Sequence, residues 1–166
     1  MNFELTEARA LLKETTPLKG DCGALCGGAC CKGDEDGQGG VYLFPGESVG
    51  DWATCADTED LGGCQMCTCH GACARDQRPL ACRLFPLTPV RVRGEWTVRL
   101  DSRAWAMCPL MRGGMRGLDP EFVVAAKAAV RLLAQDAQLR AFMGAWARLE
   151  RVFRDARGML GGDVDG

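Results

Sequence analysis

The sequence predicts one small α+β domain, irregular in its middle and rich in cysteine. The chain has 166 residues, which is a usual length for a single domain. All eleven cysteines fall between Cys22 and Cys108. Helical patterns flank this stretch on both sides, and a β-hairpin pattern lies inside it. We therefore divide the single domain 1–166 into an N-terminal helix (1–20), a cysteine-cluster region (21–110), C-terminal helices (118–157) and a flexible tail (158–166).

The first element expected is an amphipathic helix in the segment NFELTEARALLKET. Its apolar residues recur at helical spacing, and they are Leu5, Ala8, Leu11 and Leu12. Pro17 and Gly20 predict where the helix has ended. We expect its apolar face to cover the core.

Two strand signals lie in the middle of the chain. The stretch GGVYLFPGE predicts a brief strand that stops at Pro45 and Gly46. The stretch VRVRGEWTVRL alternates apolar and polar residues on either side of Gly94, which predicts a β-hairpin. Before both, the acidic and glycine-rich run 33–40 matches neither a phosphate-binding loop nor a calcium loop, so we expect a solvated turn.

The C-terminal part predicts two helices. The first of them is expected to begin with Asp119 as its N-cap, Pro120 at the first helical position and Glu121 in the first turn. The following segment DAQLRAFMGAWARLERVFRDAR carries a stripe of large apolar residues, namely Leu139, Phe142, Met143, Trp146, Leu149 and Phe153. We expect the two helices to form a helical hairpin that packs on the cysteine-cluster region.

Charge and composition exclude several classes of function. Twenty basic residues stand against twenty-two acidic ones, so the chain lacks the cationic field that supplies affinity for nucleic acid. The amino terminus has no pattern of a secretory signal, and no apolar run approaches the length needed to cross a membrane. We expect a cytoplasmic protein without nucleic-acid or membrane partners. Thiols are kept reduced in that compartment, which favours metal or redox chemistry over a disulfide framework.

The cysteine spacing decides between the known thiolate sites, which bind zinc or iron–sulfur clusters through about four ligands. Cys22, Cys26 and Cys30 are separated by three and three residues, which excludes the spacing of radical-type iron–sulfur enzymes. The run CQMCTCHGAC does not match a bacterial ferredoxin or a zinc ribbon. The even two-residue intervals between Cys64, Cys67, His70 and Cys73 leave a small zinc knuckle open as an alternative. His70 is the only histidine, which weakens hydrolase mechanisms that need a base beside a nucleophile.

The adjacent cysteines Cys30 and Cys31 carry geometric information. Neighbouring side chains of an extended backbone point to opposite sides. We therefore expect the two thiols to do different work, one as a ligand and the other as a ligand of a second centre or a core residue. A free cysteine can also be just a small buried hydrophobic residue, but eleven such residues in one chain would be unusual.

The cysteine-cluster region resembles the YkgJ-type cysteine-cluster family, which is described as a zinc- or iron-chelating domain. The resemblance covers roughly 21–110 and rests on Cys22, Cys26, the pair Cys30-Cys31, the stretch CARDQRPLACRLFPL that starts at Cys73, and CPL at Cys108. The most specific part is RPLACR, in which Arg78-Pro79 and Cys82-Arg83 match the family signature. The gaps before Cys30 are wider than the usual two residues, and Cys55, Cys64 and Cys67 have no place in the family pattern.

The resemblance implies a bound metal centre, with an iron–sulfur cluster as the first expectation and zinc as the second. The ligands we expect are Cys22, Cys26, Cys30, Cys31, Cys69, Cys73, Cys82 and Cys108. Arg78 and Arg83 would lie beside the thiolates and donate hydrogen bonds to them. One centre would draw the 22–31 loop and the 69–82 segment together, so folding would depend on the metal.

These expectations describe a cytosolic metal-binding protein with a structural, redox or metal-handling role. Its domain would fold around the metal. Two alternatives stay open. Flagellin lysine N-methylases are longer relatives that carry the motif with an iron–sulfur cluster, so the chain could be a related protein-modifying enzyme. Alternatively, the metal could only stabilise the fold of an interaction module whose terminal helices bind a protein partner.

Overall fold

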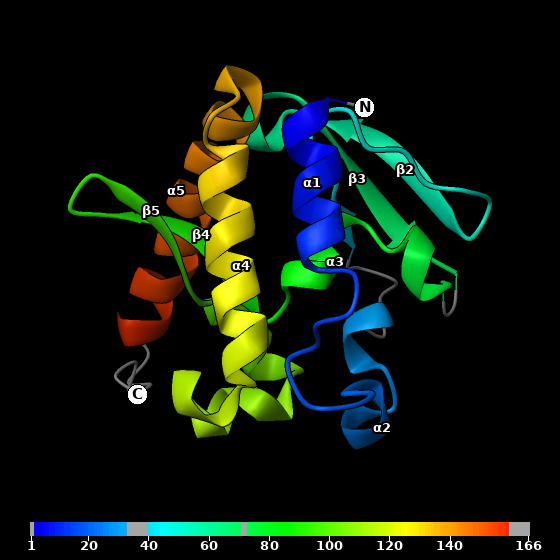
Figure 1. The fold of residues 1–166 in the computed structure, drawn as a ribbon, viewed down its shortest axis with the longest axis vertical. Helices are drawn as coiled ribbons and strands as arrows, with labels where there is room; N and C mark the ends of the chain where they lie inside the picture. Colours follow the sequence, from blue (N-terminus) through cyan, green and yellow to red (C-terminus); the bar gives the residue numbers. More distant parts are fainter. Residues whose placement is uncertain (1, 33–39, 71–72, 160–166) are drawn as a thin grey trace.

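The computed structural model describes residues 2–32, 40–70 and 73–159, and it confirms the α+β class. Within these residues the helices are α1 (Phe3–Leu11), α2 (Gly23–Cys26), α3 (Leu80–Leu84), α4 (Pro120–Leu133) and α5 (Ala137–Met159). The strands are β1 (Val41–Tyr42), β2 (Ala53–Thr58), β3 (Cys64–Cys69), β4 (Leu87–Val92) and β5 (Glu95–Leu100). Figure 1 shows α1 beside α4, with the sheet of β2 and β3 on one side and the β4–β5 hairpin on the other.

A side-chain cap begins both α1 and α4, and the sequence predicts the second of these caps. The Asn2 side chain accepts a hydrogen bond from the Leu5 backbone N–H at 2.9 Å, which starts α1. The Asp119 side chain likewise accepts from the Glu121 backbone N–H at 2.8 Å, with Pro120 at the first position of α4. The buried residues of α1 are Leu5 and Ala8, and Leu12, which follows the helix, is buried as well, whereas Leu11 is exposed. Local chemistry therefore places these helices, and burial of their apolar faces holds them.

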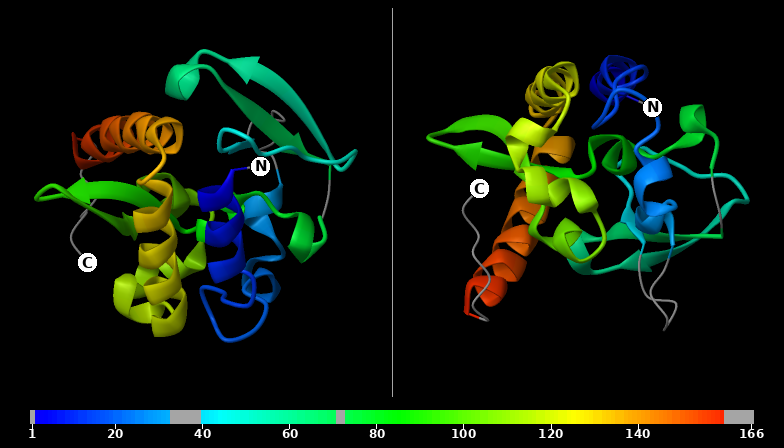
Figure 2. Two further views of the ribbon diagram at one scale, coloured as in Figure 1. Left: turned by 45° about the horizontal axis from the view of Figure 1, so that its top comes forward. Right: turned by 90° about the horizontal axis from the view of Figure 1, so that it is seen from below.

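The predicted β-hairpin is present and separates the two C-terminal helices. β4 and β5 pair antiparallel from Leu87 opposite Leu100 to Val92 opposite Glu95. The turn uses Gly94 with φ 90°, a left-handed conformation that glycine adopts without strain. α4 packs mainly on α1 and β5, whereas α5 packs mainly on β4, so the hairpin lies between the two helices (Figure 2). The apolar stripes of α4 and α5 thus contact opposite strands of the β4–β5 hairpin more than they contact each other.

The second sheet has three antiparallel strands in the order β1-β3-β2. The brief strand expected before Pro45 is confirmed as β1, but β2 and β3 are absent from the sequence prediction. β2 is largely exposed, so it has no alternating apolar pattern to signal it. β3 carries Cys64, Cys67 and Cys69, and the spacing of these cysteines in the sequence indicates metal ligands instead of a strand. This sheet brings the end of β3 to the cysteine loops.

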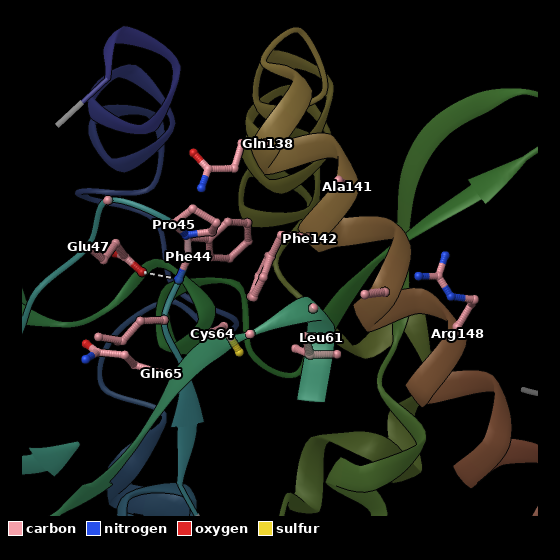
Figure 3. A pocket seen from close by; sticks show the side chains of 15 residues that line it. Phe44, Pro45, Glu47, Leu61, Cys64, Gln65, Gln138, Ala141, Phe142 and Arg148 are labelled. Carbon is pink, nitrogen blue, oxygen red and sulfur yellow. Dashed lines mark hydrogen bonds between the residues drawn. The ribbon is translucent and has the colours of Figure 1, made fainter. Parts of the chain in front are cut away.

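A buried carboxylate connects the segments around α3. The Glu47 side chain is 1% exposed and accepts hydrogen bonds from the guanidinium of Arg9 at 2.6 Å and from the backbone N–H of Leu80 at 2.8 Å. Its other oxygen accepts from the Phe44 backbone N–H at 3.1 Å (Figure 3). Burial raises the pKa of Glu47, and these donors oppose that shift. Glu47 therefore joins α1 and the segment after β1 to the first residue of α3.

Two of the expected segments lie mostly outside the described residues. The run 33–40 is described only at Gly40, and the tail 158–166 only at Gly158 and Met159, which extend α5. None of the helices within the described ranges is both long and apolar enough to cross a membrane.

Candidate metal centre

The expected ligands come from three distant segments of the chain. Cys22 precedes α2 and Cys26 ends it, while Cys30 and Cys31 lie in the 3₁₀ helix Ala29–Cys31. Gly27 and Gly28 have φ 61° and 71°, a left-handed conformation that turns the chain between these two short elements. The four thiols are thereby presented within one tight loop.

The remaining expected ligands are contributed by the two other segments. Cys69 is the last residue of β3, Cys73 follows it, and Cys82 lies in α3. Cys108 directly precedes the 3₁₀ helix Pro109–Gly113, and that helix and α2 lie at the same end of α4 (Figure 1). All eight expected ligands are free thiols, and each is half-buried apart from the exposed Cys30.

These thiols line two adjoining cavities. The first cavity has a volume of about 20 Å³ and is lined by the thiols of Cys22, Cys26, Cys30 and Cys108. The second cavity has a volume of about 270 Å³ and is lined by the thiols of Cys30, Cys31, Cys69, Cys73 and Cys82. Cys30, Phe85 and Met107 line both cavities and form the wall between them. The structure thus gathers the thiols of all three segments in one place.

The thiols are near one another without forming a closed ligand set. Within the described residues, no three His, Cys, Asp or Glu side chains are arranged so that they could hold a metal ion. The sulfur atoms of Cys30 and Cys31 are 4.0 Å apart. A set of four ligands requires the side chains to rotate inward, a change that metal binding can drive because ligation and local folding are coupled.

Hydrogen bonding between the adjacent thiols separates their acidities. The hydrogen bond from Cys30 lowers the pKa of Cys31 to about 6, and the positive charge of Arg78 acts in the same direction. The same hydrogen bond raises the pKa of Cys30, with burial adding to the shift. Cys31 is therefore the thiol best prepared to be a thiolate, which is the form that binds metals.

Burial favours the neutral form of two further thiols, Cys82 and Cys108. Burial raises the pKa of Cys82, and the neighbouring Cys69, Cys31 and Cys73 raise it further. Burial also raises the pKa of Cys108, and the neighbouring Cys26 raises it further. A metal ion would displace protons from these sites on binding.

The two expected arginines have different positions. Arg78 lines the second cavity, and its Nε is buried without a hydrogen-bond partner among the residues that the structure describes. Arg83 instead donates to the backbone carbonyls of Arg78 at 3.1 Å, Arg9 at 3.1 Å, Arg75 at 3.2 Å and Asp76 at 2.8 Å. The expectation that Arg83 donates to the thiolates is thus corrected: its guanidinium fixes the loop that carries Arg78.

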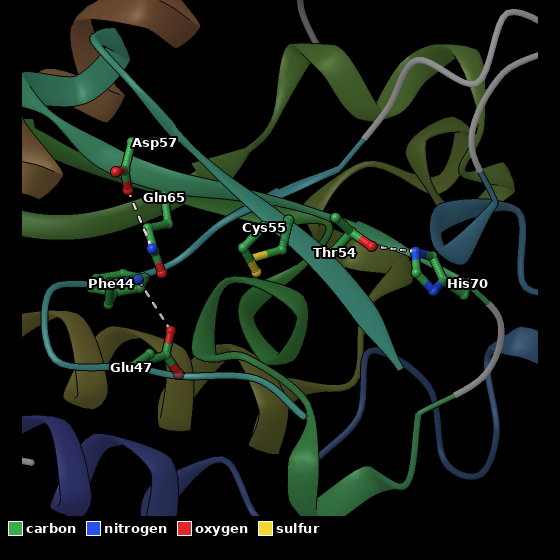
Figure 4. Close-up of a disulfide and its surroundings, with 8 residues drawn as sticks. Phe44, Glu47, Thr54, Cys55, Asp57, Gln65 and His70 are labelled. Atoms are coloured by element: carbon green, nitrogen blue, oxygen red, sulfur yellow. Dashed lines mark hydrogen bonds between the residues drawn. A yellow bond between two sulfur atoms is a disulfide. The ribbon is translucent and has the colours of Figure 1, made fainter. Parts of the chain in front are cut away.

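The three cysteines outside the family pattern are placed apart from this group. Cys55 and Cys67 face each other across β2 and β3 and form a disulfide (Figure 4), although the sequence favoured reduced thiols. This bond removes Cys67 from the zinc knuckle considered above. His70 lies on the sheet, where its Nε2 is 2.8 Å from the Thr54 hydroxyl oxygen. The knuckle alternative is therefore not what the structure forms.

Cys64 lines another pocket altogether. That pocket has a volume of about 490 Å³ and lies between α5 and the segments around β1 and β3 (Figure 3). Among the described residues that line it, Cys64 is the sole cysteine, so none of the eight expected ligands belongs to it. This pocket, which is larger than either thiol-lined cavity, thus lies away from the expected ligands.

Sequence reasoning missed part of the wall of the second cavity. Arg103 and Asp101 line it, joined by hydrogen bonds of 2.9 and 2.5 Å between guanidinium and carboxylate. The Arg103 guanidinium lies 5.6 Å from the centre of the Trp146 ring, a distance typical of a cation–π contact. Trp146 also lines the cavity, although its helical spacing indicated only core packing. Contacts between α5 and the residues after β5 leave no local signal in the sequence.

Comparison with known proteins adds no relative. The chain matches no family model, no curated protein and no solved structure. The YkgJ-type resemblance therefore rests on the motif residues alone and continues as a proposal.

Proposed function

We propose that this chain is a cytoplasmic metal-binding protein of the YkgJ type, which holds an iron–sulfur cluster or zinc through its split cysteine group. The observation that supports the proposal is the partition of the cysteines. The eight expected ligands line two adjoining cavities, whereas Cys55, Cys64 and Cys67 are placed elsewhere. Thiolates are the ligands that both zinc and iron–sulfur clusters prefer.

The residues around the cavities fit such a group. Four thiolates around Zn²⁺ carry a net charge of −2, so the site favours a nearby cation. Arg78 supplies one, and its buried Nε–H has no acceptor among the described residues. This donor would stabilise the charged form of the thiols that burial otherwise disfavours.

The role that the structure favours for the metal is to anchor the 21–32 loop. None of the residues of α2 or of the 3₁₀ helix Ala29–Cys31, all of them described, is fully buried. Apolar burial therefore contributes little to the position of this loop, while ordering each residue costs about 1–2 kcal/mol. Ligation of Cys22, Cys26, Cys30 and Cys31 would offset that cost. When bound, zinc would supply a structural link, and an iron–sulfur cluster would in addition supply a site for one electron.

Anaerobic purification followed by iron, zinc and acid-labile sulfide analysis tests this proposal. We expect stoichiometric metal in the wild type and in the control Cys64→Ser, and a reduced content in Cys82→Ser and in Cys31→Ser. Iron with sulfide and a visible absorption band supports the cluster. Zinc without sulfide rejects the cluster and keeps thiolate binding. A wild-type protein that contains neither metal and takes up neither rejects the proposal.

A further inference from the structure

The number of thiols exceeds what one centre needs. Zinc takes four protein ligands in a structural site, and the common iron–sulfur clusters take four cysteines. Eight free thiols line the two cavities, which is twice that number. This excess raises the question of how the eight are shared.

The walls of the cavities divide the thiols into two groups of four. The second cavity reaches four thiols without Cys30, through Cys31, Cys69, Cys73 and Cys82. The first cavity has only Cys22, Cys26 and Cys108 unless Cys30 joins them. Cys30 is therefore needed by the first cavity and is dispensable for the second. On this basis we infer that the chain holds two metal centres, Cys22/Cys26/Cys30/Cys108 and Cys31/Cys69/Cys73/Cys82, which adjoin at the pair Cys30-Cys31; this rests on the proposed function.

The two groups meet at one place. The pair Cys30-Cys31 links the groups, because those two sulfur atoms are 4.0 Å apart.

The two cavities differ in size and in charge. About 10–15 Å³ of such volume holds one water molecule, so the first cavity of about 20 Å³ has room for a single ion. The second cavity, at about 270 Å³, has room for a polynuclear cluster, and Arg78 lies in its wall. The first centre is therefore mononuclear, and the second can hold either a zinc ion or an iron–sulfur cluster.

Titration of the metal-free protein with Co²⁺ alone tests the inference. Cobalt occupies four-thiolate sites and gives a sulfur-to-metal absorption band, and the amount of Co²⁺ at which this band stops growing gives the number of ions bound per chain. The full chain is stripped by a chelator under anaerobic conditions, with a reductant mild enough to leave the Cys55–Cys67 disulfide closed. We expect two Co²⁺ per wild-type chain and two in the control Cys64→Ser. Cys30→Ser and Cys31→Ser should each retain one, although the substitutions are adjacent and equal in size.

Double substitutions separate the loss of a centre from general damage to the fold. Cys30→Ser combined with Cys108→Ser removes ligands from one centre and should still retain one Co²⁺. Cys30→Ser combined with Cys82→Ser removes ligands from both and should retain none. Far-UV circular dichroism checks that the helices persist in each variant, including α3, where Cys82 lies next to the core residue Ala81.

The outcomes distinguish this inference from the function on which it rests. One Co²⁺ per wild-type chain, or complete loss in both Cys30→Ser and Cys31→Ser, overturns the two centres and leaves a single thiolate centre. Retention of two Co²⁺ in either variant also overturns the division. Absence of the sulfur-to-cobalt band in the wild type overturns the proposed function itself.

Discussion

Replacement of Glu47 by alanine should destabilise the protein strongly, because this carboxylate satisfies three donors at a buried position. Its side chain is 1% exposed, and its partners are the Arg9 guanidinium and the backbone N–H groups of Leu80 and Phe44. The substitution leaves all three donors without their acceptor. Leu80 begins the helix that carries Cys82, so the loss also affects the position of one expected ligand.

The magnitude follows from the buried pair. Removing one partner of a buried ion pair costs about 3–5 kcal/mol. Each buried N–H left without an acceptor costs about 1–3 kcal/mol, and these terms overlap. We therefore expect Glu47→Ala to lower the free energy of unfolding by at least about 3 kcal/mol. Urea denaturation followed by circular dichroism measures this loss, and an unchanged m-value shows that the folded state is the same.

Two variants make the measurement specific. Glu47→Gln keeps the shape and one acceptor oxygen, so it should cost less than the alanine variant, about 1–3 kcal/mol. Glu14→Ala is the surface control, because that carboxylate is 84% exposed and 3.8 Å from Lys13, and it should change stability by less than about 1 kcal/mol. A loss below about 1 kcal/mol for Glu47→Ala would refute the argument that this network holds α3 in place.

Three further predictions follow from the structure. Phe122→Ala should cost about 3–5 kcal/mol in a denaturation experiment, because the ring is fully buried, whereas Phe153→Ala, at a position that is 50% exposed, should cost about 0.5 kcal/mol or less. Burial raises the pKa of Glu150, so stability is greatest below its ordinary value and falls as pH rises through the raised value. Glu150→Gln should show a smaller fall as the pH rises above about 4, and an equal fall would contradict this. Replacing Cys55 and Cys67 together by alanine should lower the free energy of unfolding by about 2–4 kcal/mol and leave the cobalt stoichiometry unchanged; a lost equivalent would mean that they are ligands.

The parts of the fold that sequence predicts well are those with local causes. Asp119 and Pro120 mark the start of α4 because an N-cap and a first-turn proline act within a few residues. Gly94 marks the hairpin turn because glycine adopts the left-handed conformation of this position without strain. β2 could not be predicted, because it is a largely exposed strand that depends on pairing with β3.

The candidate site shows the same limit. The sequence identifies cysteine as the chemistry and the pair Cys30-Cys31 as its most informative feature. It cannot show that Cys30 lies on the wall between two cavities, since Cys108 and Cys82 reach those cavities through tertiary packing. Arg83 was expected beside the thiolates because of its position in RPLACR, yet its guanidinium points to backbone carbonyls. A motif gives the identity of such residues and leaves their direction undetermined.

X-ray absorption spectroscopy of the metal in anaerobically purified wild-type protein tests the central claim most directly. We predict a first shell made of sulfur alone, with four sulfur ligands per metal and, for zinc, a distance of about 2.3 Å. Cys31→Ser should lower the amount of metal bound in this sulfur environment. A first shell dominated by oxygen or nitrogen would contradict the claim that the thiols gathered around the two cavities form the metal-binding site.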